Sequence, residues 1–461
     1  MKTHTVRLHQ PFNSSDVITN SPANIQAILA TKCNDFAFGA ARKENLLSFL
    51  GNGIFTAEGE AWSHYRAKLK PQFARSQVSD LESAQQHLNI LWKALPAEDS
   101  DGWVGGKQKG VDIMPFIFRF TMDVSTEFLF GTSVGSQSHV ISLNGDGAAG
   151  AEASVNDERM KEDIEFAEAM TYAQEFISWR VRLQSLYWLA NPKKFRDAEQ
   201  TVKAYADKFV KMALEKEVKK GGDVETGGKE KFVLLDAMVA ETRDPIELRD
   251  QVLQVLLAGR DTTSALLSWV FLLLAQHPPI FQHLRDQIIS TFGPETSSTP
   301  LTFESLKACK PIQHVLFETL RLYPLVPVNG RKAVRDTTLP EGGGPDHSQP
   351  IAIRKGEAIG YSAYVLQRRH DLWGEDADEF KPERWEGRKL GWDFIGFSGG
   401  PRICLGQQYA LNEAAFVVAR FMQRFDKLEY LGSKGRIAKR LTLTLTPKDG
   451  VKVRLHRASD S

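Results

Sequence analysis

Apolar residues recur at intervals of three and four along most of the chain, which is typical of α-helices with one buried face. The helices that this spacing predicts span residues 80–95, 162–188, 197–220, 247–276, 279–292, 311–323 and 405–425. Short β-type runs predict strands at 5–8, 351–353, 358–361, 441–445 and 451–455. Stretches rich in glycine, serine and acidic residues predict loops at 131–156, 221–229, 293–299 and 339–350. The pattern favours one large domain, residues 1–461, that is mainly α with a minor β region.

The longest predicted helix has sequence signals at both of its ends. Asp244 can cap the N-terminus, Pro245 suits the first helical position, and Glu247 stands where a capping box has its carboxylate. Pro278 and Pro279 end the helix. About 30 residues at 1.5 Å each give roughly 45 Å, which is enough to cross a domain.

Polar residues interrupt this apolar helix at its middle. The run is Gly259, Arg260, Asp261, Thr262 and Thr263. The charges would be costly in lipid, so we interpret the segment as a buried helix and not as a membrane span. Loss of a side chain at Gly259 would let a flat ligand approach the backbone, while Asp261 and Thr262 could hold water and pass protons. The alternative is a kinked core helix with a satisfied Asp–Arg pair.

Composition and charge narrow the classes of function. The chain has 58 basic and 57 acidic residues and a net charge of +1, so it has no overall field that would attract nucleic acid. Its cysteines, Cys33, Cys309 and Cys404, are odd in number and far apart, which argues against a disulfide scaffold and a structural zinc site. The polar N-terminus lacks the apolar core of a signal peptide.

A pair of opposite charges is a further candidate for a structural or chemical role. Glu318 and Arg321 are three residues apart on one predicted helix face, and Arg384 is a candidate third partner if the pair is buried. An ordinary surface ion pair is the alternative.

The strongest local signal is the cysteine loop, residues 397–406, with the sequence FSGGPRICLG. Two glycines and a proline predict a rigid turn, and a helix is expected to follow at once. Cys404 would then lie at a helix N-terminus, which favours a thiolate. A thiolate beside Phe397 and Arg402 suits ligation of haem iron, with Arg402 facing a propionate. An inert buried thiol is the alternative.

Taken together, these motifs resemble those of the cytochromes P450, the haem-thiolate monooxygenases. The resemblance is carried by the cysteine loop, A-G-x-D-T-T at 258–263, E-x-x-R at 318–321, P-E-R-W at 382–385 and W-x-x-x-R at 62–66, in the family's order. More narrowly, residues 118–131, 336–344 and 397–411 resemble the fungal branch that hydroxylates alkanes and fatty acids.

The resemblance implies a role for each matching residue. Cys404 would be the axial ligand of haem b, Phe397 and Gly259 would contact the haem, and Asp261 and Thr262 would deliver protons to dioxygen. The propionates would be held by Trp62, Arg66, Arg331 and Arg402. Glu318, Arg321 and Arg384 would lock the fold behind the cysteine loop. The implied reaction inserts one oxygen atom of O₂ into a C–H bond of an apolar substrate and releases water.

The resemblance also implies partners. No G-x-G-x-x-G opens a helix after a strand, so we expect electrons from NADPH to come through a separate NADPH–cytochrome P450 reductase. Arg66, Lys68 and Lys70 are its candidate docking residues, with an ordinary solvated face as the alternative. A monomer is expected, with O₂ and a small lipophilic substrate as ligands.

Microsomal members of the family begin with a membrane anchor, whereas this chain opens near the family's first β-region. We therefore expect no anchor in this chain. The family implies the cytosolic face of the endoplasmic reticulum membrane, and the chain as written would be cytosolic.

The family's substrate pocket would draw on residues 49–55, 176–183, 255–259, 325–329 and 442–445, which are mostly apolar. These suit a fatty acid or n-alkane hydroxylated at or near its end; another lipophilic fungal metabolite or a xenobiotic is the alternative. Arg180 or Arg182 could meet a carboxylate, although a solvated helix charge is the simpler interpretation.

Two rival functions come from other classes. Residues 396–400 fit the G-x-S-x-G elbow of serine hydrolases, with Ser398 as nucleophile, but only His456 follows and the flanking elements do not match. A haem-binding sensor without turnover is the second rival, and the Asp261–Thr262 pair argues against it.

Overall fold

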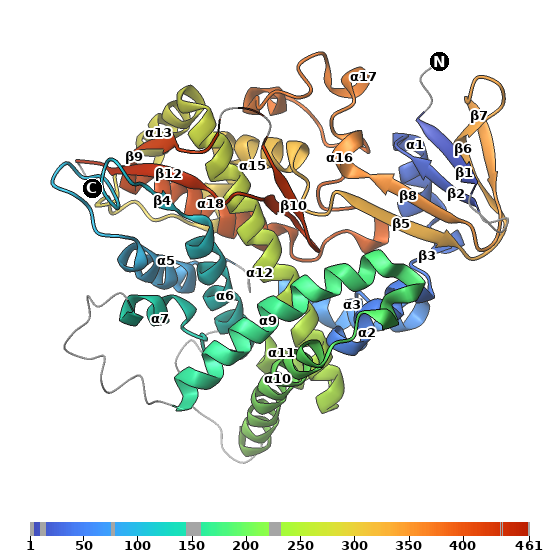
Figure 1. The fold of residues 1–461 in the computed structure, drawn as a ribbon, viewed down its shortest axis with the longest axis horizontal. Helices are drawn as coiled ribbons and strands as arrows, with labels where there is room; N and C mark the ends of the chain where they lie inside the picture. The colour runs from blue at the N-terminus through green and yellow to red at the C-terminus, as the bar shows by residue number, and fades with distance from the viewer. Residues whose placement is uncertain are drawn as a thin grey trace. The chain divides into compact units, whose positions relative to one another are not determined.

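The computed structural model describes residues 4–9, 15–74, 79–143, 158–220, 232–433, 435 and 437–459. The chain is mainly α with small sheets, as the sequence predicts (Figure 1). Its contacts divide it into two units, each described by itself. The sheet unit comprises residues 1–43 and 313–407, and the helical unit comprises residues 44–312 and 408–461.

The sheet unit is built on a five-stranded sheet in the order β1-β2-β8-β5-β3. Its strands are β1 Thr5–His9, β2 Ser15–Thr19, β3 Phe36–Ala37, β5 Val328–Ala333 and β8 Ala358–Ser362, and β6 Thr337–Gly343 pairs with β7 Gln349–Ile353 as a hairpin. The β2 and β8 strands are parallel, with Val17 opposite Ile359, and the other pairs are antiparallel. Its helices are α1 Pro22–Gln26, α16 Ala363–Leu366, α17 His370–Trp373 and most of α15 Lys310–Leu322.

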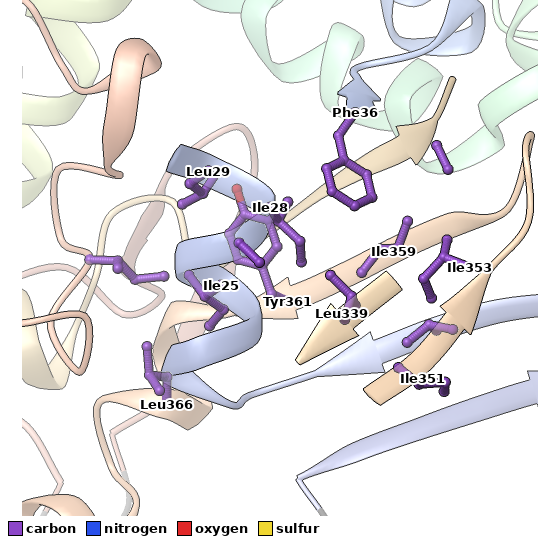
Figure 2. Packing of buried hydrophobic residues seen from close by; sticks show 14 of the residues in the cluster. Ile25, Ile28, Leu29, Phe36, Leu339, Ile351, Ile353, Ile359, Tyr361 and Leu366 are labelled. Carbon is purple, nitrogen blue, oxygen red and sulfur yellow. The ribbon is translucent and has the colours of Figure 1, made fainter. Parts of the chain in front are cut away.

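A buried apolar cluster holds this unit together (Figure 2). Ile25, from α1, and Ile28, from the π-helical turn Ala27–Thr31 that follows it, face strand residues such as Ile353, Ile359 and Leu339. Each of these five side chains is at most 1% exposed. This packing fixes the π-helical turn against the sheet. The turn then supports the cysteine loop, residues 397–406, which is described below.

The helical unit surrounds the long helix α12, Pro245–Gln276. Its other helices are α2 Ala40–Leu50 for the most part, α3 Gly59–Leu69, α5 Glu82–Ala94, α6 Met114–Phe130, α7 Ser136–Leu143, α9 Glu158–Leu183, α10 Lys193–Lys220, α11 Leu234–Val239, α13 Pro278–Phe292, α14 Phe303–Ala308 and α18 Gln407–Arg424. The strands β4 Val111–Asp112, β12 Lys452–Arg457 and β9 Phe425–Tyr430 form one sheet, and β10 Lys439–Leu441 pairs with β11 Leu445–Pro447. Helix α12 packs against α6, α10 and α13.

The predicted start and end of the long helix are confirmed, with one correction. The Asp244 carboxylate accepts a hydrogen bond from the Ile246 amide at 2.9 Å, and the helix ends before Pro278. Glu247 instead accepts from the Lys68 amine at 2.8 Å and from the Thr242 hydroxyl at 3.0 Å. The predicted capping box is therefore wrong, because a tertiary ion pair takes up this carboxylate.

Several other predictions of elements need correction. Residues 339–350, expected as a loop, contribute to the β6–β7 hairpin, and 441–445, expected as one strand, contain a turn between β10 and β11. Helix α7 lies within the expected loop 131–156, whose residues 144–156 lie outside the described part, as does all of 221–229. Among the described helices no single one is long and apolar enough to cross a membrane; α12 and α13 pass that test only as a pair bent by 112°.

Candidate functional site

The cysteine loop of the sheet unit is a tight turn with an exposed thiol at its end. The Cys404 amide donates to the Phe397 carbonyl at 3.1 Å, and the Ile403 amide donates to the Gly400 carbonyl at 3.0 Å. A short 3₁₀ turn spans Gly400–Arg402. The Cys404 side chain is exposed, so the loop presents its sulfur and does not bury it as an inert core thiol.

Glycine is required at the tip of this loop. Gly400 has a φ of +64°, and a Cβ atom there would lie 1.8 Å from the backbone oxygen of Leu29. The tip therefore packs directly onto the π-helical turn described above, which no larger residue would allow.

The position of Cys404 relative to the following helix differs from the expectation. Helix α18 begins at Gln407, three residues after Cys404. Only the turn at residues 405–406 separates Cys404 from the helix, so the sulfur lies just before the helix N-terminus and not within it. The sequence correctly predicted the rigid turn but placed the helix start too early.

Three guanidinium groups meet at one aromatic ring in the same unit. The guanidinium carbons of Arg42, Arg331 and Arg402 lie 3.8, 4.1 and 4.5 Å from the centroid of the Phe38 ring. The Asn329 side-chain oxygen accepts from Arg42 at 3.1 Å and from Arg331 at 3.4 Å. So much positive charge in one place favours an anionic ligand.

This cluster supports the expected propionate role of Arg331 and Arg402 and adds a residue that the sequence did not reveal. Arg331 is held by strand β5, where it pairs with Ile359 of β8. Arg42 belongs to no motif; it lies four residues after Phe38, and only the fold brings Arg331 and Arg402 to the same ring. An exposed thiol and clustered arginines in one unit suit a group that contains both a metal and carboxylates, as haem does.

The Glu318 and Arg321 side chains are fully buried and bonded to each other. Arg321 Nε and Nη2 donate to the two Glu318 oxygens, both at 2.8 Å. Arg384 Nε also donates to Glu318 at 2.8 Å, which confirms it as the third partner, and Trp385 Nε1 donates at 2.9 Å. The remaining Arg321 donors bond backbone carbonyls, including that of Gln367 at 2.8 Å. The ion pair is therefore a buried, satisfied network and not a surface pair.

The polar run of α12 lies in the helical unit. Arg260 donates to the side-chain oxygens of Gln174 at 2.6 Å and Thr171 at 2.9 Å, and its Nη1 lies 3.3 Å from Asp261 Oδ1. Thr262 Oγ1 donates to the carbonyl of Ala258, one turn earlier, at 2.6 Å. The Asp–Arg pair of the alternative interpretation is present, and so is the predicted bond from the threonine to its own helix.

Asp261 also lines a partly open cavity of about 710 Å³ in the helical unit. Its other walls include Arg260, Glu175 and Arg440, and the last two are joined by a hydrogen bond of 2.6 Å. Burial raises the pKa of the Asp261 carboxyl, although Arg260 opposes the shift and Glu175 adds to it. A carboxyl with a raised pKa at a cavity wall can take up and release a proton.

At Gly259, an added Cβ atom would meet only the Ser125 hydroxyl, at an ordinary distance of 3.6 Å. Packing inside the helical unit therefore does not explain this glycine.

The remaining predicted residues lie on α3 of the helical unit. The guanidinium of Arg66 lies 5.6 Å from the Trp62 ring centroid. Lys68, expected at a docking face, forms an ion pair with Glu247 at 2.8 Å, and its side chain is 17% exposed. Lys70 is exposed.

Comparison with known proteins identifies the family. The family model described as "Cytochrome P450" matches residues 3–453. The chain belongs to the cytochrome P450 family. It is 46% identical over 453 residues to cytochrome P450 monooxygenase g430 of a Fusarium species, which covers 98% of this chain and 77% of that protein.

Similar proteins also occur among yeasts. Cytochrome P450 52A3-A of Candida maltosa is 44% identical over 440 residues, covering 94% of this chain and 80% of that protein. Cytochrome P450 52A13 of Debaryomyces hansenii is 42% identical over 447 residues, covering 95% and 81%.

As a cytochrome P450, the protein is an oxygen-incorporating monooxygenase whose family cofactor is haem iron. Membership excludes the serine-hydrolase alternative. Ser398 does have a φ of +63°, as a nucleophile elbow can, but the described residues show no strand immediately before it and only a 3₁₀ turn after it.

Proposed function

We propose that this cytochrome P450 hydroxylates fatty acids or n-alkanes at or near the chain end. The proposal rests on the alkane- and fatty-acid-hydroxylase motifs quoted above, together with the 42–46% identity to fungal P450s over nearly the whole chain. The exposed thiol of Cys404 beside the arginine cluster is the observation that carries the haem-thiolate chemistry.

In this proposal Cys404 is the axial ligand, and Phe397 and Gly259 contact the haem. The propionates are held by Trp62, Arg66, Arg331, Arg402 and, as a new member of the set, Arg42. Bound haem supplies the activation of dioxygen. Glu318, Arg321 and Arg384 keep their part of the fold rigid through buried hydrogen bonds.

Asp261 and Thr262 take part in proton transfer. The raised pKa of Asp261 lets its carboxyl carry a proton, and the cavity that it lines is the source from which water would resupply that proton. The Thr262 hydroxyl donates to the Ala258 carbonyl, which leaves its oxygen lone pairs available to accept a hydrogen bond from a passing water.

Electrons come from NADPH through a reductase that docks on a basic face including Arg66 and Lys70. The chain acts as a monomer at the cytosolic face of the endoplasmic reticulum membrane. Exposed apolar side chains support a membrane contact, because Trp179, Trp188 and Leu189 are each 61% exposed.

The test is turnover under labelled dioxygen. The haem-loaded protein, a P450 reductase and NADPH are supplied with dodecanoate or dodecane under ¹⁸O₂, and products are analysed by mass spectrometry. We expect one ¹⁸O atom per product, at or near the chain end. NADPH consumption without hydroxylated product from either chain, but with product from a sterol or another lipophilic compound, would contradict the proposed substrate class.

A further inference from the structure

The last turn of α9 contains an arginine that points inward. Arg180 is only 4% exposed, whereas its neighbours Trp179 and Val181 are 61% and 39% exposed. This reverses the usual distribution, in which apolar residues are buried and arginine faces water. It also corrects the expectation of a solvated helix charge. Because burying a guanidinium is costly unless it is matched, such a residue calls for an explanation.

The Arg180 guanidinium lacks a full set of hydrogen-bond and ion-pair partners. One of its terminal nitrogens donates to the Ser48 hydroxyl of α2 at 3.0 Å, and its Nε is buried without a hydrogen-bond partner. In the part of the chain that the structure describes, no carboxylate forms an ion pair with it. Aromatic rings cover the group instead: its guanidinium carbon is 5.0 Å from the Tyr187 centroid and 5.2 Å from that of Phe195.

The local charge balance favours an added anion. Lys203 of α10 donates to the backbone oxygen of the same Ser48, which brings a second positive charge to this residue. The nearby carboxylate is Glu199, which is 9% exposed, and its Oε1 is also without a hydrogen-bond partner. Two positive groups and one negative group leave a net charge of +1, which one carboxylate would neutralise.

The surroundings of this site suit a long apolar chain behind the carboxylate. Phe49 and Leu50, which follow Ser48 on α2, are fully buried. Phe176, one turn before Arg180 on α9, packs on Phe195 with ring centroids 4.9 Å apart. A polar end held by Arg180 would therefore lead into aromatic and aliphatic side chains.

We propose that Arg180, assisted by Ser48, binds the carboxylate of the substrate and so selects fatty acids over alkanes and alcohols. This inference rests on the proposed function, since it assigns the polar end of an acyl-chain substrate to Arg180. The Tyr187 ring covers the guanidinium and is the group that the carboxylate would displace. Burial lowers the pKa of Arg180, which is the expected cost of holding this charge ready for an anion.

The test compares dodecanoate with dodecan-1-ol, which has the same chain and no charge. Dissociation constants are read from the spin-state change of the haem-loaded protein. We expect Arg180→Gln to weaken dodecanoate binding by about 10- to 100-fold, because a charge-assisted hydrogen bond is lost, and to change dodecan-1-ol binding less than about twofold. Arg180→Lys should recover part of the loss. The terminal hydroxylation of dodecanoate should also spread to inner positions in Arg180→Gln.

Two further variants separate binding from folding. Lys161→Gln, on the same helix at an exposed position, should leave both constants unchanged. Ser48→Ala should weaken the binding of dodecanoate by about three- to tenfold and leave the binding of dodecan-1-ol unchanged. If Arg180→Gln weakens the binding of both ligands equally, or of neither, the carboxylate-binding role of Arg180 is refuted while the proposed substrate class stands. A wild-type protein that binds neither ligand would overturn both.

Discussion

Replacing Glu318 by glutamine should destabilise the protein severely without changing the shape of the side chain. The buried Glu318 carboxylate accepts five hydrogen bonds, from Arg321 Nε and Nη2, Arg384 Nε, Trp385 Nε1 and the Lys381 amide. Three of them reach one oxygen and two reach the other. In Glu318→Gln, the amide group that replaces one oxygen faces at least two donors, and both guanidinium groups lose their buried counter-charge.

The magnitude follows from these bonds. Each buried donor left unmatched costs about 1–3 kcal/mol, so two cost about 2–6 kcal/mol. Removal of one partner of a buried ion pair costs about 3–5 kcal/mol, which lies within the range obtained from the unmatched donors. Since a folded protein is stable by only about 5–15 kcal/mol, this change would remove a large part of its free energy of unfolding.

The assay is urea unfolding of the haem-loaded protein, followed by tryptophan fluorescence. A matched control is Asp197→Asn, which removes the carboxylate of an exposed pair with Lys193 at the same 2.8 Å distance. The control should cost at most about 0.5 kcal/mol. The reasoning is refuted if Glu318→Gln lies within about 1 kcal/mol of the wild type, or if the two variants are equally unstable.

Further changes test other parts of the account. Gly400→Ala should disrupt the cysteine loop, because its Cβ atom would overlap a backbone oxygen 1.8 Å away; haem content measured after purification should fall, and unchanged content would argue against the packing described. Lys381 and Arg384 lower the pKa of Asp376 to about 2, so the stabilisation from this carboxylate is present above its unfolded pKa of about 3.9 and is lost as the pH falls through about 2. The wild type should therefore lose stability as the pH falls from about 4 to about 2, whereas Asp376→Asn, already less stable at pH 7, should lose less stability over the same range; identical pH profiles would contradict this. Thr262→Ala should keep the thiolate spectrum and divert reducing equivalents to peroxide, which is measured as hydrogen peroxide formed per NADPH; an unchanged product yield would refute the proton relay.

The elements that the sequence predicted well are those whose ends carry a capping residue or a proline. Helix α12 was bounded correctly because Asp244 and Pro245 mark its start and Pro278 its end. Strand β5, with the sequence VNGRKA, was missed because it contains glycine and two charges and shows no alternation. The β6–β7 hairpin was missed because its glycines are typical of loops, although Gly343 pairs with Gln349 across the two strands.

The site was predictable where family motifs carried it and unpredictable where the fold assembles it. Arg384 could be named as a partner of Glu318, 66 residues away, only because the surrounding sequence argued for burial. Arg42 is only four residues from Phe38, but tertiary structure alone brings Arg331 and Arg402 to the same ring, so the sequence did not reveal Arg42 as part of the cluster. Likewise, no local pattern reveals that α9 turns Arg180 inward, since its apolar neighbours face solvent.

The most direct test of the account is the absorption spectrum of the reduced carbon monoxide complex, recorded for the wild-type protein and for Cys404→Ser. We predict the long-wavelength Soret band of a thiolate-ligated haem in the wild type, and its complete loss in Cys404→Ser. A wild-type protein that binds no haem, or a variant that keeps the thiolate band, would contradict the assignment of Cys404 as the axial ligand.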